Sequence, residues 1–554
     1  MTATYDTIDR DIFQYQIVGV AEEMSRALRR SAYSPVIWDM YDYACALFST
    51  QGDMLAQSRT IPAQLGTMGT ALNHMIGVIP LEEWRPGDVL VCNDPYRGCT
   101  HTMDITLFSP IFSGGELIAI SSTIAHHIDI GGAVPCSTSV DLGEVFGEGL
   151  IFPPMKLVDG GKPNQTALDF VSSNVRDPRA CLGDLRAQIA GCTTAERRVS
   201  ELTEHYGNAG FRDLSAECLD YGERYVRKVI AGFGDGRREA EVLVEDGVTS
   251  DERLRIRVAV EIEGDEMAID FDGTSAQRPF ALNCPWSSTV SLTTYAVKCL
   301  TSPAIPQNDG CNRPVRICAP SGSLLNPQRP AAVGHRHFIA QSVADAVLKA
   351  LSPAAPERSC AGCQISFSLL FIGGKDDRAE VLRMPGRPTH YQIMDTVGGG
   401  MGGHSAGDGM SAVDVHGSNC AILSAEVMET LSPIRVLRSS LVPGSGGDGE
   451  HRGGLAIERD YQLLSESAVF SSTLQQANDD TAPWSARGGQ PGGKSLAVLN
   501  PGTERERVLA PRTPAMTVHR GDTLRLRAAG GGGFGDPAAR KSVERERDRV
   551  EGLV

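Results

Sequence analysis

The chain has few aromatic residues, no long apolar stretch and no excess of positive charge. Aromatic side chains make up 6% of its 554 residues. No run of about 18 apolar residues occurs, so no membrane-spanning helix is expected. The formal net charge is −16 at pH 7. Because nucleic acids and anionic membranes bind basic protein faces, this charge argues against both partners. The hydrophobic content of 41% is typical of a soluble globular protein with a large core.

Cysteine is thinly spread along the chain. Fourteen cysteines in a chain of this length do not form the dense pattern of a small secreted domain, which indicates reduced thiols. The only CxxC sequence, Cys360 to Cys363, has no second pair at zinc-finger spacing and is interpreted as structural. The segment MTATYDTIDRDIFQYQ is acidic and lacks the charged-then-apolar pattern of a signal peptide. We therefore expect a cytoplasmic protein.

Periodicity predicts a mixed α and β (α+β), multi-domain fold that is helix-rich early and β- and glycine-rich late. Helices are expected over residues 9–32, 71–79, 184–207, 218–234, 286–300 and 338–352. Strands are expected over 43–50, 54–58 and 88–98, two more over 104–126, and a β-meander from 238. Later strands are expected in 366–374, 390–403, 458–466, 494–502 and 523–537, and a charged helix or tail at the end. The predicted domains are 1–235, 236–380 and 381–554.

Two segments match well-known motifs but lack their structural context. GGQPGGKS, residues 488–495, satisfies the phosphate-loop pattern, but LAVLNPG after it predicts a short strand instead of the helix that cradles phosphate. GHSAG, residues 403–407, satisfies the GxSxG pattern with Ser405 as the nucleophile, but glycines crowd the approach and a poor helix follows. We interpret both as glycine-rich structure that allows close backbone approach.

Histidine is scarce, with twelve residues, yet three histidines gather beside aspartates in one region. His101 and Asp104 lie in CTHTMDITLFSPIF, in a turn ahead of a strand, and His126 and His127 lie in AHHIDIGG, near the end of the next strand. Neighbouring side chains of a strand face opposite ways, so one of the two adjacent histidines faces a site with His101 while the other faces away.

Two further aspartates belong to this region. Asp129 shares the face of His127, and Asp42 lies just before a strand that would carry it to the same place. Two imidazoles with two carboxylates suit Zn²⁺, Mn²⁺ or Fe²⁺. The alternative interpretation is that these are separate capping and core residues.

Many segments along the chain resemble segments of the hydantoinase B/oxoprolinase family and occur in the same order. That family includes the B subunits of N-methylhydantoinase, bacterial 5-oxoprolinase and caprolactamase, and the corresponding subunits of acetone and acetophenone carboxylases. NDPYRGCTHTMDITLFSPIF and AHHIDIGG carry the likeness, and DLRAQIAG, PAAVGHR, SAEVMETLSPIRV, PWSARGGQPGG and GGGGFGDP follow in family order. The chain departs from the common pattern at IWDMYDYACALF, at CTH and at GMGGHSAGDG, which leaves the substrate open.

The resemblance implies a metal subunit that works with a larger, ATP-binding A subunit of the hydantoinase A type, assembled as a heterotetramer of two A and two B chains. It places a divalent metal on Asp42, His101, Asp104 and His126, in the domain 1–235, with His127 as the other candidate for the last ligand. His127 and Asp129 are candidates to carry a proton during catalysis. The glycine-rich segments around 398–409 and 530–536 are expected to form a subunit contact or a channel.

Three functions remain open from the sequence. The first is ATP-dependent opening of a cyclic amide such as a hydantoin, 5-oxoproline or a lactam, in which the A subunit activates the amide and a metal-activated water attacks it. The second is a subunit of an ATP-dependent ketone carboxylase. The third is a non-catalytic scaffold for the A subunit.

Overall fold

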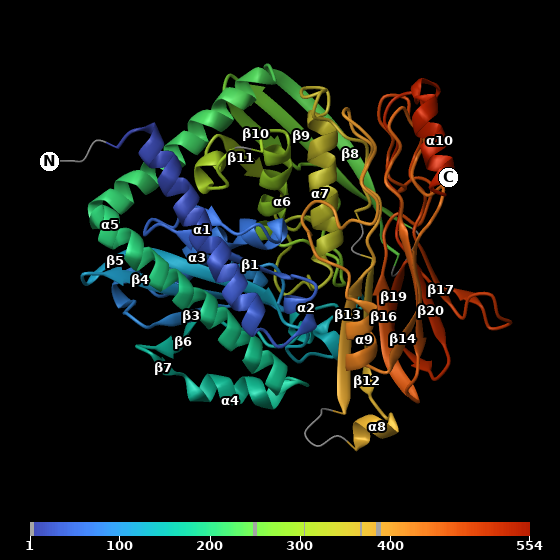
Figure 1. Cartoon of the computed structure of the whole chain (residues 1–554), viewed down its shortest axis with the longest axis horizontal. Coiled ribbons are helices and arrows are strands. Elements are labelled where there is room, and N and C mark those ends of the chain that lie inside the picture. The colour runs from blue at the N-terminus through green and yellow to red at the C-terminus, as the bar shows by residue number, and fades with distance from the viewer. Residues whose placement is uncertain (1–4, 248–251, 304, 366–367, 384–388) are drawn as a thin grey trace.

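The structure is a computed structural model that describes residues 5–247, 252–303, 305–365, 368–383 and 389–554. Helices and sheets are mixed along the chain, as predicted. The described helices are α1 (Thr7–Ser31), α2 (Pro35–Trp38), α3 (Pro62–Val78), α4 (Gln165–Asn174), α5 (Pro178–Gly232), α6 (Trp286–Cys299), α7 (Arg336–Leu351), α8 (Ala379–Leu382), α9 (Ala425–Leu431) and α10 (Ser542–Val550). Figure 1 shows the β-rich C-terminal part along one side of the molecule, with α10 at its edge.

The first sheet carries the candidate site. Its strands lie in the order β2-β1-β5-β4-β3-β6-β7, and each pairs with its neighbour in the antiparallel direction. Their bounds are β1 (Tyr43–Phe48), β2 (Met54–Gln57), β3 (Val89–Cys92), β4 (Asp104–Ser113), β5 (Glu116–His126), β6 (Met155–Asp159) and β7 (Lys162–Pro163). The predicted hairpin and the two predicted strands over 104–126 are confirmed.

Helices cover both faces of this sheet. Phe13 of α1 and Phe211 of α5 pack with Leu47 of β1 on one face. Met68 of α3 packs with Phe48 and Phe108 on the other. Strands β1 and β3 of this sheet are therefore buried at every position, and apolar residues predominate along both.

The predicted β-meander forms a second sheet in the order β11-β10-β9-β8. Its strands are β8 (Gly236–Glu245), β9 (Arg253–Glu263), β10 (Glu266–Asp270) and β11 (Val315–Cys318), and β11 pairs with β10 in the parallel direction. Val258 and Ile256 of β9 share one core with Leu292 of α6 and Val343 of α7. Helix α7 is buried along nearly its whole length, so it brings its polar residues into the interior of the molecule.

Two antiparallel sheets form the C-terminal part. One has the order β13-β12-β16-β19 and the other β14-β15-β20-β17-β18, and Phe470 and Tyr461 belong to the core that they share. Their strands are β12 (Leu369–Lys375), β13 (His390–Thr396), β14 (Ile434–Leu441), β15 (Ile457–Leu463), β16 (Ser467–Thr473), β17 (Leu496–Leu499), β18 (Arg507–Val508), β19 (Arg512–His519) and β20 (Thr523–Arg527). Ser366 and Phe367 of the predicted strand 366–374 lie outside the described residues.

Four glycine-rich segments, 399–403, 446–454, 489–493 and 530–533, pack on one another beside these sheets; we call them the glycine layer. Backbone hydrogen bonds join them, for example from Gly403 N to Gly532 O at 2.8 Å and from Gly530 N to Gly493 O at 2.9 Å. A Cβ on Gly453 or Gly531 would overlap a carbonyl of a neighbouring segment. The chain itself fills the space beside these glycines. The expected subunit contact or channel stays a prediction.

The division into domains at residues 235 and 380 stays a prediction. All fourteen cysteines lie in the described ranges, and none forms a disulfide. Within these ranges, no helix has an apolar stretch of the length that a bilayer crossing needs.

Candidate functional site

The ends of two paired strands bring His101, Asp104 and His126 together. Strand β4 begins at Asp104 and β5 ends at His126, and these two residues lie directly opposite each other in the sheet. The turn before β4 carries His101, whose carbonyl accepts a hydrogen bond from Asp104 N at 3.2 Å. The backbone N–H of His126 donates to the carbonyl of Asp42 at 3.1 Å, which fastens the start of β1 beside the same strand end.

The three side chains converge on one oxygen. His101 Nε2 lies 3.2 Å from Asp104 Oδ1, and His126 Nδ1 lies 3.1 Å from the same atom. All three residues are buried. Their ligand atoms lie within 4.8 Å of one another, and no other group of three or more His, Cys, Asp or Glu residues in the described ranges meets that criterion. Neighbouring ligand atoms around an ion bound at about 2.1 Å lie about 3.0–3.4 Å apart, so the spacing fits a small divalent cation.

Asp42 lies at the edge of this group. Its Oδ2 is 4.0 Å from His126 Nδ1. The amide of Gln64, on α3, donates to Asp42 Oδ1 at 2.8 Å and to Asp104 Oδ1 at 3.4 Å. Gln64 thereby ties the two carboxylates to each other and to the first turn of α3.

The second oxygen of Asp104 is held by two other residues. Arg336, on α7, donates from Nη2 to Asp104 Oδ2 at 2.9 Å, and both side chains are buried. The hydroxyl of Thr100 donates to the same oxygen. The two oxygens of Asp104 therefore have different partners: Oδ2 accepts hydrogen bonds from Arg336 and Thr100, and Oδ1 faces the two histidines.

His127 and Asp129 do not join the group. The ring of His127 contacts Gln188 of α5, with Nε2 3.1 Å from Oε1, on the other face of the strand. Asp129 forms an ion pair with Arg176 at 2.7 Å and also accepts the backbone N–H of that residue. In the structure each side chain has a partner outside the group, Gln188 for His127 and Arg176 for Asp129. Their role as proton carriers stays a prediction.

Burial and charge set the protonation of the group. Burial, with Arg336 nearby, lowers the pKa of His101 to about 4, so its ring is neutral near pH 7. Burial raises the pKa of Asp42 to about 6. Burial also disfavours ionised Asp104, but His101, His126 and Arg336 hold the pKa of this carboxyl well below its ordinary value. Asp104 is therefore the group's permanent anion.

A small cavity of about 50 Å³ opens beside the group. Asp42, Gln64, His101, Asp104, His126 and Arg336 line it, together with apolar side chains of β12 and β13 that include Leu369, Phe371 and Met394. Residues from the first sheet, from α3, from α7 and from the C-terminal part therefore meet at one cavity, with charged groups on one side and apolar walls on the other.

Sequence reasoning missed Gln64 and Arg336 as members of this site. A signal for Arg336 was present: it stands in VGHRHF between His335 and His337, two of the twelve histidines of the chain. Both rings are buried, and burial lowers the pKa of His335 to about 3. Gln64 gives no such signal, because a single glutamine in a helix has no distinguishing spacing.

Three relatives align along nearly the whole chain. An uncharacterized protein of Methanocaldococcus jannaschii is 33% identical over 97% of this chain and 92% of its own length. A protein of Pseudomonas sp. strain NS671, provisionally named as the B component of a D-/L-hydantoinase, is 31% identical over 99% of this chain and 93% of its own length. The 5-oxoprolinase 1 of Arabidopsis thaliana is 29% identical over 96% of this chain, which spans 42% of that longer protein.

Two solved structures share the fold. The ATP-dependent caprolactamase from Pseudomonas jessenii superposes with a TM-score of 0.91 and 28% identity, over 100% of this chain and 95% of that one. A nucleotide-free acetone carboxylase superposes with a TM-score of 0.89 and 21% identity, over 99% of this chain and 78% of that one, a likeness of fold alone. Residues 6–537 match the family described as hydantoinase B/oxoprolinase. The chain belongs to the hydantoinase B/oxoprolinase family.

Proposed function

We propose that the chain is the metal-holding B-type component of an ATP-dependent enzyme that opens a cyclic amide. The observation that carries the proposal is the buried group of His101, Asp104 and His126, in a chain of the same fold and family as an ATP-dependent caprolactamase. The cyclic amide is a hydantoin, 5-oxoproline or a lactam.

The donor set supports a divalent ion on His101, Asp104 and His126, with Asp42 as the fourth ligand. The Nδ1 of His101 lies 3.3 Å from the carbonyl oxygen of Gly334, which only accepts hydrogen bonds, so Nδ1 carries the proton of the neutral ring. Nε2 then presents a lone pair to Asp104 Oδ1 at 3.2 Å. Two acceptors facing each other at this distance repel unless a cation lies between them, and Zn²⁺, Mn²⁺ and Fe²⁺ accept this set of ligands.

The chain's own residues orient the reacting groups. When bound, a divalent ion supplies a Lewis acid for the carbonyl and acidifies water. Arg336 and Thr100 hold Oδ2 of Asp104, which leaves Oδ1 directed at the site. Gln64 holds Oδ1 of Asp42. The apolar walls formed by Leu369, Phe371 and Met394 limit access of bulk water to an activated amide.

ATP is assigned to a partner, a hydantoinase A-type subunit, in a heterotetramer of two A and two B chains. An unactivated amide is a poor electrophile, so phosphorylation of its oxygen would provide the leaving group. The relative provisionally named as a hydantoinase B component supports a partnered enzyme. The phosphate-loop pattern at 488–495 runs directly into strand β17 (Leu496–Leu499), and Lys494 pairs with Asp479 at the surface.

The test is to purify the chain with its A-type partner and to measure opening of 5-oxoproline, hydantoin and caprolactam with and without ATP. Ring opening that requires ATP, both chains and a divalent metal is expected. ATP-dependent consumption of bicarbonate with a ketone would instead assign the carboxylase function. This assay is included because the chain shares the fold of an acetone carboxylase. A complex that assembles normally but binds no metal would assign a scaffold.

A further inference from the structure

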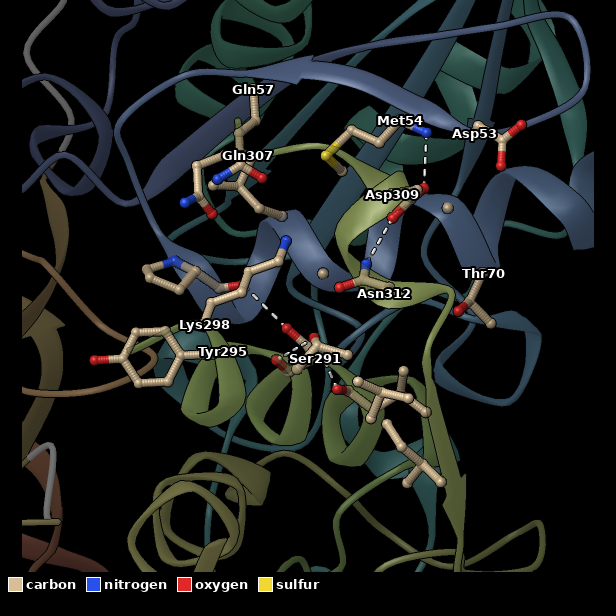
Figure 2. A pocket seen from close by; sticks show the side chains of 18 of the residues that line it. Asp53, Met54, Gln57, Thr70, Ser291, Tyr295, Lys298, Gln307, Asp309 and Asn312 are labelled. Carbon is tan, nitrogen blue, oxygen red and sulfur yellow. Dashed lines mark hydrogen bonds between the residues drawn. The ribbon is translucent and has the colours of Figure 1, made fainter. Parts of the chain in front are cut away.

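A larger pocket, of about 770 Å³, lies on the other side of α3 from the candidate metal group. The turn between β1 and β2, the face of α3 that carries Gly66, Gly69 and Thr70, helix α6 and residues 307–317 enclose it. Figure 2 shows side chains from these segments directed toward a common space. Pro62 and Leu65 line this pocket, whereas Ile61, Ala63 and Gln64 line the metal-site cavity, so the first turn of α3 separates the two.

One cationic side chain extends into the pocket without a protein partner. Lys298 projects from the last turn of α6 toward the space that Gln307 and Asp309 also border (Figure 2). Among the described residues, none accepts a hydrogen bond from the Lys298 ammonium or forms an ion pair with it. The other cation of the lining, Arg313, is already paired with Asp220 and Glu223. Lys298 is therefore the cation of this pocket that remains available to an anionic ligand.

Two carboxylates of the pocket provide the opposite charge. Asp309 is held in place because its Oδ2 accepts the backbone N–H of Met54 at 2.7 Å and its Oδ1 accepts the amide of Asn312 at 2.8 Å. Each oxygen keeps a further lone pair, and burial raises the pKa of this carboxyl. Asp53, in the adjacent turn, forms no ion pair within the described ranges. Neither carboxylate forms an ion pair with Lys298 in the described residues, although the Lys298 charge acts at Asp309 and lowers its pKa against the effect of burial. The pocket therefore presents charges of both signs.

The remaining lining suits a small, flexible molecule. Met54, Leu65, Val290 and Ile317 supply apolar surface in the lining that also carries the charged groups. On α3, Gly69 places no side chain between the helix and Asp309; a Cβ there would lie 3.6 Å from Oδ2. An apolar chain of a few methylene groups with a charge at each end would match both the walls and the charges.

We propose that this pocket binds a small zwitterionic amino acid, with its carboxylate at Lys298 and its ammonium at Asp309 and Asp53. Hydrolytic opening of a cyclic amide breaks the C–N bond, adds the oxygen of water to the carbonyl carbon and leaves a proton on nitrogen, so the product carries one carboxylate and one amine. The identification of the ligand as the ring-opened product rests on the proposed function; the charge pattern of the pocket does not.

The test is isothermal titration of the full chain with 6-aminohexanoate, hexanoate, hexylamine and L-glutamate. Saturable binding of 6-aminohexanoate is expected, at least tenfold tighter than that of either compound with a single charge, because each charge-assisted contact contributes about tenfold or more. L-Glutamate tests whether a shorter separation of charges is accepted. Equal binding of hexanoate and 6-aminohexanoate, or no saturable binding of any of the four, would overturn the proposal.

Variants locate the binding. Lys298→Met and Asp53→Asn should each weaken binding of 6-aminohexanoate at least tenfold, whereas Lys162→Met, on exposed β7, should leave it unchanged. His101→Ala should still bind 6-aminohexanoate, because this pocket is distinct from the metal group. Loss of 6-aminohexanoate binding in His101→Ala, or unchanged binding in Lys298→Met, would contradict the assignment. Ring opening by the assembled enzyme is measured separately. Binding without ring opening leaves the pocket assignment standing, and ring opening without binding overturns the pocket alone.

Discussion

Asp104 is the residue on which the candidate site depends, because its two oxygens face different partners. Oδ1 faces His101 and His126, and Oδ2 is bound by Arg336 and Thr100. A ligand carboxylate held in this way has one orientation before any ion binds, which lowers the entropic cost of binding.

His101→Ala should abolish metal binding while the fold remains intact. One ligand of four is lost, but the cores of this large chain do not depend on a metal to form. Elemental analysis after incubation with zinc or manganese should give about one ion per chain for the parent and none for the variant. His205→Ala, at an exposed position on α5, is the control. Loss of the parent's circular dichroism spectrum in His101→Ala would indicate a structural role.

Arg336→Met should destabilise the metal-free protein by about 3–5 kcal/mol, because it leaves Asp104 as a buried charge without its cation. Denaturant unfolding of metal-free samples measures the change, with Arg186→Met on the exposed side of α5 as the control. Stability within about 0.5 kcal/mol of the parent would mean that the ion pair contributes little to holding Asp104.

Glu148 predicts a pH dependence of stability. Its Oε1 accepts the backbone N–H groups of Val333 and Gly334, just before Arg336, and burial raises the pKa of the carboxyl to about 8. From about pH 4.5 to 8 the folded chain keeps a proton that the unfolded chain has lost, so stability falls as the pH rises. Glu148→Gln cannot ionise, and its thermal midpoint should fall less than that of the parent between about pH 5 and 8. Parallel curves would contradict the assignment.

Among the elements, those with a strong local period were predictable from the sequence. The helix expected over 9–32 is α1 (Thr7–Ser31), which begins earlier because Asp6 and Asp9 form a capping box. The meander and the helices near 286–300 and 338–352 are confirmed to within two residues. Helix α3 was expected only from residue 71, yet it starts at Pro62. Gly66 and Gly69 weaken the helical pattern there, and packing against α6 supports the helix instead.

The glycine layer predicts a sharp contrast between two alanine substitutions. Gly531→Ala would place a Cβ on the carbonyl of Met401, so the segments must separate and the loss of stability should be large. Gly19→Ala, inside α1, has nothing within 4 Å of the new Cβ and should stabilise by roughly 0.5–1 kcal/mol. Thermal unfolding of both variants measures the contrast. A soluble Gly531→Ala protein that unfolds with the parent would show that the layer can separate at little cost.

At the scale of the whole molecule, the three residues that meet at the candidate site were predictable and the residues that support them were not. His101, Asp104 and His126 lie within 26 residues of sequence, in a hairpin whose pairing the strand pattern predicts. Arg336 and Gln64 reach the group only through the packing of α7 and α3, over separations of 232 and 40 residues from Asp104. The spacing of residues in a single sequence does not predict such long-range contacts. It also does not predict that β12 and β13 supply the apolar wall.

Assembly is the prediction for the molecule as a whole. The chain alone should show no ATPase activity, and it should co-purify with its A-type partner as two A and two B chains. Light scattering after mixing the purified subunits measures the mass. Lys494→Ala should leave ATP turnover of the complex nearly unchanged, because this side chain is paired with Asp479 at the surface. Full-rate ring opening by this chain alone without ATP would contradict the partner and the mechanism together.

The cavity beside the candidate metal group is closed by segments far apart in the sequence, which affects the order of events during translation. His101, Asp104 and His126 are synthesised early, whereas the wall residues Met394, Thr396 and Cys420 follow about 270 residues or more after His126. At about 5–20 residues per second, the ribosome needs roughly 15–55 s to make the intervening chain. Throughout that interval the three residues lack the wall that later covers them. An ion can therefore reach His101, Asp104 and His126 in the nascent chain without passing that wall.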